Sequence, residues 1–347
     1  MRAWLEKQVM AAWQQRGWLA YLCWPLAQLF RVLIQFRMGL FVMGYKPQTR
    51  LTIPVIVVGN IFVGGTGKTP LVIWLVQQLQ AAGLHPAVVS RGYGAAAQQV
   101  LAVDDKAQAA QVGDEPLLIR QRCGCPVMVG RDRVAAAKQL LLNHPEVDVL
   151  IADDGLQHYY LARDLEIVLF DQRGAGNGWL MPAGPLREPV SRRRDFTVLN
   201  AAPDVQSSTV PGVPADAVRM QLITQQAWQL SAPEQRRTLA SFAGQRMCAA
   251  AGIGHPERFF QTLTAAGCSF ERLPLADHQV FDAATFRQTQ ADYVLITEKD
   301  AVKCSQIPAL QNDTRIWVVP VEAQLSAGFA ADLLSMILEK KRGSSPA

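Results

Sequence analysis

Short apolar runs alternate with segments of helical periodicity along the first two thirds of the chain. Runs of four to six apolar residues predict buried strands, and apolar residues that recur every three or four positions predict helices. The predicted strands cover residues 54–58, 87–90, 127–129, 147–152, 166–170 and 197–200, with predicted helices at 69–82, 114–122 and 131–143. This alternation predicts an α/β fold, with a parallel sheet covered by helices on both faces.

A second alternating set follows a proline-containing segment. Residues 201–216, which include Pro203, Pro211 and Pro214, predict a linker between a first domain at 51–200 and a smaller C-terminal α/β domain at 217–342. The predicted elements of that second domain are strands at 246–251, 269–273, 293–297 and 316–321, and helices at 256–266, near 283–290 and near 325–341. We expect residues 343–347 to form a disordered tail.

The first fifty residues differ from the rest in charge and aromatic content. They carry seven basic residues against one acid, a net charge of +6, whereas the whole chain carries +5, and they hold four of the eight tryptophans. Their longest uncharged run, 17–30, has 14 residues, which is shorter than the roughly 20 needed to cross a bilayer. Basic residues mixed with Trp, Phe and Leu favour helices in the headgroup plane.

We therefore predict that residues 1–50 form amphipathic helices that pack on the first domain and associate with a membrane surface. A helical hairpin on the protein's own core, or a tilted single span, are the alternatives. Pro25 is expected to bend or start a helix. We expect no nucleic-acid ligand and no obligate protein partner.

The cysteines give no sign of a disulfide framework or of zinc. They are sparse and unevenly placed, and Cys123-Gly-Cys125 lacks both zinc-site spacing and a second pair. The six are Cys23, Cys123, Cys125, Cys248, Cys268 and Cys304. We expect reduced thiols in a cytosolic setting.

The most informative motif is Gly59-Asn-Ile-Phe-Val-Gly-Gly-Thr-Gly-Lys68-Thr69, between a predicted strand and a predicted helix. Such a turn directs backbone N–H groups at an anion, and the helix start adds its positive end. We predict a P-loop in which Lys68 reaches the β- and γ-phosphates of ATP and the Thr69 hydroxyl binds Mg²⁺. The predicted nucleotide-binding residues are Phe62, Val63, Gly64, Gly65, Thr66, Gly67, Lys68 and Thr69.

This P-loop match is imperfect. Phe62 stands where the usual pattern has glycine, so Gly64 and Gly65 must supply the flexibility. A plain glycine turn with a surface lysine is the alternative.

A second motif ends the predicted strand 147–152 in Asp153 and Asp154. In P-loop folds, an acid at the end of a neighbouring strand holds Mg²⁺. Asp153 as a helix cap is the alternative. The predicted metal-binding residues are Thr69, Asp153, Asp154 and Glu115, and the sequence leaves open which aspartate would bind the ion directly.

Further polar clusters lie outside these two motifs. The segment 113–116 contains Asp114 and Glu115 at a predicted helix start, where either could serve as a cap. The segment 192–194 consists of three arginines, which predict a solvated face, with phosphate recognition as the alternative.

Taken together, the motifs resemble the tetraacyldisaccharide 4'-kinase family, the lipid A 4'-kinases of bacterial envelope synthesis. The run 58–70 carries the resemblance first. The other matching segments follow in the family's order over nearly the whole chain, at 90–94, 113–116, 153–158, 182–189, 277–278 and 297–303.

The resemblance implies transfer of the γ-phosphate of ATP, with Mg²⁺, to the 4'-hydroxyl of tetraacyldisaccharide 1-phosphate. The product would be lipid IVA, in the biosynthesis of lipid A for the bacterial outer membrane. It also implies a glycolipid substrate and a monotopic enzyme on the cytoplasmic face of the inner membrane.

The resemblance also implies roles for individual residues. Asp114 would be the general base, paired with His278, and Lys68 and Asp154 would complete the catalytic set. Pairing Asp114 with His278 requires the second domain to close over the first. The expected substrate contacts are Arg91, Tyr93, Gln157, Arg131 and Arg187.

Two other classes of protein remain open on the sequence. A membrane-recruited P-loop ATPase switch or assembly factor would use the same loop without a small-molecule acceptor. Many such proteins carry a lysine where Val63 stands here, and the segment 297–300 lacks the spacing of a guanine-reading motif. A non-enzymatic membrane adaptor with a degenerate nucleotide site would not need intact Lys68, Thr69 and Asp153.

Overall fold

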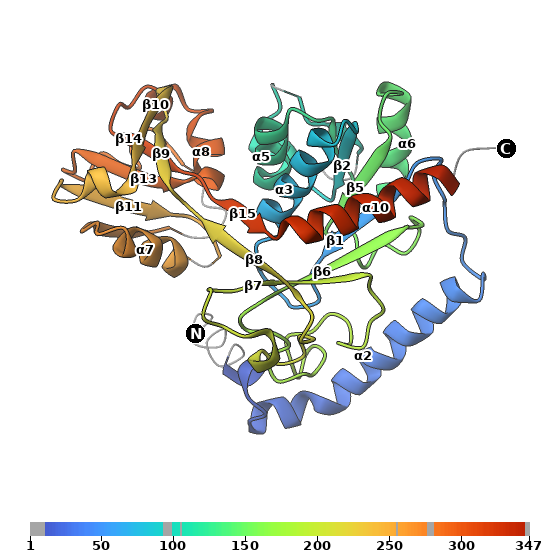
Figure 1. The fold of residues 1–347 in the computed structure, drawn as a ribbon. Coiled ribbons are helices and arrows are strands. Elements are labelled where there is room, and N and C mark those ends of the chain that lie inside the picture. The colour runs from blue at the N-terminus through green and yellow to red at the C-terminus, as the bar shows by residue number, and fades with distance from the viewer. Residues whose placement is uncertain (1–10, 93–98, 105, 255, 276–280, 344–347) are drawn as a thin grey trace.

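The computed structural model describes residues 11–92, 99–104, 106–254, 256–275 and 281–343. Two lobes lie side by side, and a long N-terminal helix runs along the outside of the first (Figure 1). Tyr93, His278 and the last four residues of the predicted tail lie outside the described residues, so what we expect of them stays a prediction.

Within the described residues, the first lobe is built on a nine-stranded sheet with the order β15-β8-β7-β6-β1-β5-β2-β4-β3. The strands are β1 (Val55–Gly59), β2 (Pro86–Ser90), β3 (Leu101–Ala102), β4 (Val127–Val129), β5 (Val149–Asp153), β6 (Leu165–Asp171), β7 (Phe196–Asn200), β8 (Val218–Ile223) and β15 (Glu322–Leu325). All neighbours pair in parallel except the two edge strands β3 and β15. The predicted α/β class with a parallel sheet is confirmed.

Helices and loops bury both faces of this sheet. Ile56 and Val58 belong to one core cluster, whereas Val55 and Val57 belong to the other. The first face carries α3 (Lys68–Ala81), α4 (Ala109–Val112), α5 (Asp114–Cys123) and α10 (Ala327–Gly343), and the second carries α6 (Arg133–Asn143). Because both faces are covered, the central strands are mostly apolar.

The second lobe contains a six-stranded sheet among the described residues, with the order β10-β9-β14-β13-β11-β12. Its strands are β9 (Gln226–Gln229), β10 (Ala232–Thr238), β11 (Met247–Ala251), β12 (Glu271–Pro274), β13 (Tyr293–Thr297) and β14 (Ile316–Val319), with helices α7 (Pro256–Ala265), α8 (Glu298–Cys304) and α9 (Pro308–Gln311). The helix predicted near 283–290 was wrong, since this segment forms turns. Asp282 and Thr285 hydrogen-bond locally there, and such bonds compete with helix formation.

The second lobe is inserted between β8 and β15, two neighbouring strands of the first sheet, so the chain divides differently from the expected boundary at 217. Residues of β8 pair with β7, and β15 returns from the second lobe to pair with β8. The helix α10 then packs against the first lobe, where Phe329 stacks on Trp74 at 5.7 Å. The segment 201–216 lies within the first lobe, because Val210 and Val213 are buried in its core. Alternation of strands and helices along a sequence does not say which sheet a strand joins.

The longest helix described in the N-terminal segment is α2 (Trp18–Val42), of 25 residues with Pro25 inside it. Among the described residues it is the one helix long and apolar enough to cross a membrane by length and composition, and only 11% of its apolar window is buried. Arg31 and Arg37, which divide the apolar sequence of this segment into shorter runs, lie inside the helix and do not interrupt it. Length and composition do not separate a span from a helix that lies on the surface.

The helix α2 packs on the first lobe along one side, with Ala27 buried and Phe30 against a core cluster of that lobe. Near its start, the Tyr21 ring meets Trp179 edge-on at 5.1 Å, and near its end Phe41 packs on Tyr159 and Tyr160. The opposite face is apolar and exposed. We call this face the outer stripe, and its residues, spaced by three or four, are Trp18, Leu22, Leu26, Leu29, Leu33 and Phe36.

A buried ionic network lies beneath the end of α2. The Arg192 side chain is only 3% exposed and forms ion pairs with Glu188 and Glu166. Gln157 donates a hydrogen bond to Glu188 at 2.8 Å. The prediction of a solvated arginine face was therefore wrong for Arg192, whereas Arg193 is exposed.

We expect Arg192→Met to destabilise the fold by about 3–5 kcal/mol, because it leaves the buried Glu188 carboxylate without its cation. Arg193→Met is the matched control and should change the free energy of unfolding by less than about 0.5 kcal/mol. Chemical denaturation of both variants measures the difference. Equal effects of the two substitutions would contradict the importance of the network.

Candidate active site

The glycine-rich loop follows β1 and leads directly into α3, in the order that the sequence predicts. Gly64 and Gly67 adopt φ values of +108° and +97°, a region that favours glycine. At Gly67 space is also short, because an added Cβ would lie 2.6 Å from the Asn200 amide nitrogen. Glycine at this position is therefore required by both conformation and packing.

The first part of the loop is tied to the segment 185–187. The Val63 N–H donates to the Pro185 carbonyl at 2.9 Å, and the Arg187 N–H donates to the Ile61 carbonyl at 2.7 Å. The Phe62 ring is buried in the core, with the Arg173 guanidinium 4.3 Å from its centroid. The Phe62 side chain and the Val63 N–H, both expected at the nucleotide, are thus used within the protein.

In the second part of the loop, three successive backbone carbonyl groups each accept a hydrogen bond from a side chain. These are the carbonyls of Gly64, Gly65 and Thr66, and their donors are Asn60 Nδ2 at 3.0 Å, Arg173 Nη2 at 2.9 Å and Asn200 Nδ2 at 2.9 Å, respectively. In a trans peptide the N–H points opposite to the C=O. Anchoring these carbonyls therefore also orients the N–H groups of the residues that follow, as a phosphate-binding loop requires.

Lys68 and Asp154 meet beside the loop. The Lys68 Nζ donates to Asn60 Oδ1 at 2.8 Å and lies 3.4 Å from Asp154 Oδ1. Asp154 Oδ2 is 3.6 Å from Arg187 Nη1. Burial acts to raise the pKa of Asp154, but Lys68 and Arg187 outweigh it and hold that pKa below its usual value. An anionic group is thus held between two cations at the phosphate loop.

Asp154 also has an unusual backbone. Among the described residues it is the one non-glycine with positive φ, at 50°. Strained backbone of this kind is concentrated at functional sites.

Asp153 is a buried carboxylate with an unused oxygen. It ends β5, is 2% exposed, and accepts a hydrogen bond at Oδ2 from the Ser90 hydroxyl at 3.0 Å. Its Oδ1 is buried and has no hydrogen-bond partner within the described residues. Burial, and then the charge of Glu115, raise the pKa of Asp153 to about 7. A magnesium ion would satisfy this oxygen and compensate its charge.

No group of three or more His, Cys, Asp or Glu side chains in the described part of the chain could hold a metal by itself. Magnesium is commonly bound by one or two carboxylates together with substrate phosphates. The Asp153 and Asp154 pair fits that arrangement.

The second lobe brings lysines to the carboxylates at the start of α5. The Lys303 Nζ lies 3.1 Å from Oδ2 of the buried Asp114, and the Lys299 Nζ lies 3.7 Å from Glu115 Oε1. Both lysines come from α8. In the sequence, 297–303 is one of the segments that resemble the family. Its contact with 113–116 could not be predicted, because no local pattern pairs the two segments.

Those expected substrate contacts that the structure describes lie around the same edge of the sheet. Arg187 contacts Asp154 at 3.6 Å, and Gln157 joins the site to α2, since its carbonyl accepts a hydrogen bond from Arg37 at 3.4 Å. Arg91 and Arg131 are exposed and follow the carboxyl ends of β2 and β4.

Sequence reasoning missed several polar residues of the site, which are Asn60, Ser90, Arg133, Arg173, Asn200, Lys299 and Lys303. Asn60 and Ser90 lie inside the motifs at 59–69 and 90–94, so membership of these motifs is the signal that could have indicated them. The buried Arg133 donates to the Asp154 carbonyl at 3.5 Å, and nothing in its sequence context indicates this.

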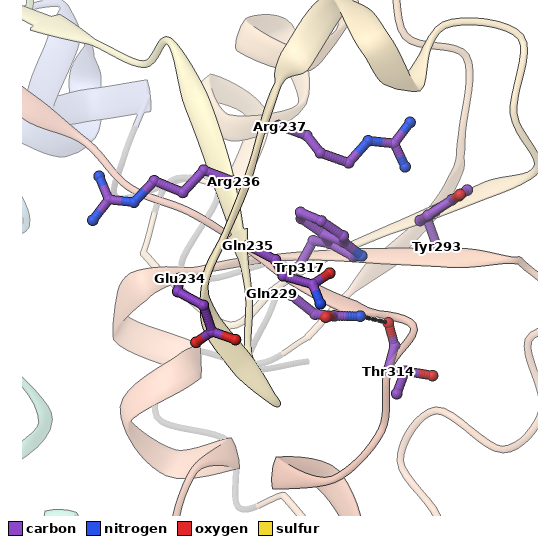
Figure 2. A pocket seen from close by; sticks show the side chains of 8 residues that line it. All are labelled: Gln229, Glu234, Gln235, Arg236, Arg237, Tyr293, Thr314 and Trp317. Atoms are coloured by element: carbon purple, nitrogen blue, oxygen red, sulfur yellow. Dashed lines mark hydrogen bonds between the residues drawn. The ribbon is translucent and has the colours of Figure 1, made fainter.

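A hollow of about 680 Å³ opens elsewhere, on the second lobe, and its lining residues are Gln229, Glu234, Gln235, Arg236, Arg237, Tyr293, Thr314 and Trp317 (Figure 2). Tyr293 is the first residue of β13 and Trp317 the second of β14, whereas Lys299 follows the carboxyl end of β13. The hollow therefore lies at the other end of that sheet and is not part of the candidate site.

Comparisons with known proteins identify the family. The sequence profile described as LpxK, tetraacyldisaccharide-1-P 4'-kinase, matches residues 19–338. The tetraacyldisaccharide 4'-kinase of Janthinobacterium sp. (strain Marseille) is 55% identical over 98% of this chain and 97% of its own, and that of Herminiimonas arsenicoxydans is 54% identical over 99% and 98%. The crystal structure of LpxK from Aquifex aeolicus in complex with ATP is 26% identical, with a TM-score of 0.74 over 93% of this chain and 99% of that chain. The chain therefore belongs to the tetraacyldisaccharide-1-phosphate 4'-kinase family, as its motifs suggested.

Proposed function

We propose that this kinase transfers the γ-phosphate of ATP to the 4'-hydroxyl of tetraacyldisaccharide 1-phosphate, the lipid A precursor. The observation that carries the proposal is the convergence of Lys68, Asp154 and Arg187 beside the glycine-rich loop. A membrane-recruited ATPase switch is not favoured, because relatives at 54–55% identity over nearly the full length are named as kinases of this acceptor.

The loop is proposed to bind the triphosphate. Its oriented N–H groups and the start of α3 would face the phosphate oxygens. Lys68 would exchange its contacts with Asn60 and Asp154 for the β- and γ-phosphates. Positive charge there opposes the negative charge that spreads over the transferred group in the transition state.

Magnesium would be held by Asp153, Asp154 and Thr69, with Glu115 as a further candidate, and would neutralise charge on the phosphates. The unpaired Oδ1 of Asp153 supports this assignment.

The acceptor hydroxyl must lose its proton as it attacks phosphorus, and Asp114 is proposed to accept it. Asp114 is buried and lies 3.1 Å from Lys303. Lys303 is proposed to hold the carboxylate in place, and His278 keeps the orienting role that the family resemblance implies. Since Lys303 comes from the second lobe, the base is assembled from both lobes.

The glycolipid is proposed to arrive from a membrane surface in contact with α2. The outer stripe of α2 is apolar and exposed, and its other side contacts Tyr159 and Trp179 in the loops next to the site. Apolar side chains would enter the headgroup region, and basic residues of the same segment would favour anionic lipid. We place this attachment on the cytoplasmic face of the inner membrane, where ATP is available.

Lys68→Ala should lower turnover by about 10²-fold or more, because a preorganised cation at the transferred group is lost. Mass spectrometry of disaccharide 1-phosphate incubated with Mg·ATP measures the gain of one phosphate. Lys138→Ala, at an exposed lysine of α6, is the matched control and should keep wild-type turnover. Full activity in the Lys68 variant would exclude the proposed role of the loop.

Asp114→Asn should lower turnover by about 10²-fold or more while leaving Mg·ATP binding in place, because the proton acceptor alone is lost. Asp332→Asn, at an exposed carboxylate of α10, should have no effect. Near-normal turnover of a folded Asp114 variant would remove this residue from the role of base.

Replacing Leu22, Leu29 and Leu33 by Gln together should weaken binding to vesicles of anionic phospholipid by at least about tenfold, because apolar area no longer enters the bilayer. Leu142→Gln tests a leucine that is 77% exposed on α6 and should bind vesicles normally. Vesicle sedimentation measures both. Unchanged binding of the triple variant would show that the outer stripe does not contact the membrane.

A further inference from the structure

We propose that Arg258, carried by the second lobe, is a positioning residue for the phosphate loop and acts through Asp171 and Arg173. The inference rests on the proposed use of that loop to bind ATP. It adds a link between the second lobe and the nucleotide that none of the sequence motifs includes.

Asp171 fixes the orientation of Arg173. Asp171 ends β6 and is 1% exposed, so its carboxylate requires partners inside the protein. Arg173 supplies its backbone N–H to Oδ1 at 2.9 Å, its Nη2 to Oδ2 at 2.7 Å, and its Nε to both oxygens at 3.0 Å. A planar guanidinium bound by two oxygens in this way has little freedom to rotate.

Arg173 in turn fixes part of the loop. Its Nη2 donates to the Gly65 carbonyl at 2.9 Å, and its guanidinium stacks on the Phe62 ring. Because the peptide after Gly65 is planar and trans, a bonded carbonyl on one side directs the Thr66 N–H to the other. Glycine at 64 and 65 leaves this peptide free to turn unless something holds it. The orientation of Arg173 therefore bears directly on a donor of the phosphate loop.

Arg258 reaches the same carboxylate from the other lobe. It lies on α7, and its Nη2 is 3.8 Å from Asp171 Oδ2, the oxygen that Arg173 Nη2 also uses. At this distance the contact is an ion pair without a direct hydrogen bond. Two cations now share one negative charge, so movement of α7 changes how strongly Asp171 holds Arg173. It also changes the positive charge available to a triphosphate.

A purely structural role, in which Arg258 fastens the lobes together, is less well supported by the geometry. Shorter contacts already join the lobes, namely Arg122 with Glu298 at 2.5 Å and Lys303 with Asp114 at 3.1 Å. The Arg258 side chain is 37% exposed, and a long ion pair at such a site contributes little to stability. Its effect should appear in nucleotide binding rather than in unfolding.

The test is direct titration of Mg·ATP to the full-length wild-type protein and to Arg258→Ala, together with KM for ATP, KM for disaccharide 1-phosphate, kcat and the melting temperature. Arg258→Ala should raise Kd and KM for ATP by about three- to tenfold, with KM for the lipid and the melting temperature unchanged. Arg258→Lys should recover part of the affinity. Arg272→Ala is the matched control, because Arg272 pairs with Glu257 within the second lobe at 3.1 Å, and it should behave as wild type.

A double substitution tests the route through Asp171. If Arg258 acts on the loop by this carboxylate, adding Arg258→Ala to Asp171→Asn should weaken ATP binding no further. Additive effects would overturn the route. Four other results would each overturn the proposal. Two concern ATP affinity, namely an unchanged affinity in Arg258→Ala or an equal loss of affinity in Arg272→Ala. The other two are an Arg258→Ala variant in which only the melting temperature falls and one in which only KM for the lipid changes. Failure of the wild-type protein to bind Mg·ATP would instead contradict the proposed function.

Discussion

The site depends on the anchoring of backbone carbonyls in the glycine-rich loop. Glycine allows the loop its left-handed backbone at positions 64 and 67, but the same freedom would let the peptides rotate. Side chains from three separate places in the chain, Asn60, Arg173 and Asn200, each hold one carbonyl. A planar peptide couples each carbonyl to the N–H of the next residue. These bonds therefore determine where the backbone N–H groups of the loop point in the absence of a ligand.

Both lobes place charged side chains at the candidate site. The first lobe supplies the loop and the aspartates at the end of β5, whereas the second supplies Lys303, Lys299 and Arg258. The chain passes between the lobes twice, after β8 and before β15, which are neighbours in the first sheet. Ion pairs between the two lobes, such as that of Lys303 with Asp114, thus bring residues of both lobes together.

The helix α2 is connected to the same framework. Arg37 of α2 bonds the carbonyl of Gln157, whose side chain bonds the buried Glu188. The residue before Glu188 is Arg187, which contacts Asp154 and pins the start of the loop through its N–H. The exposed apolar face of α2 and the candidate site are therefore joined by the contacts of a few residues.

Local patterns determined much of this from the sequence alone. The strand, glycine loop and lysine, the aspartate pair that ends the predicted strand 147–152 and the parallel α/β class are all short-range features, and the order of the motifs identified the family. Only the tertiary structure decided that β8 and β15 join the first sheet, that Arg192 is buried beside Arg193 on the surface, and that Lys303 meets Asp114. These outcomes depend on contacts between residues far apart in the chain, and the periodicity of a segment carries no information about its distant partner.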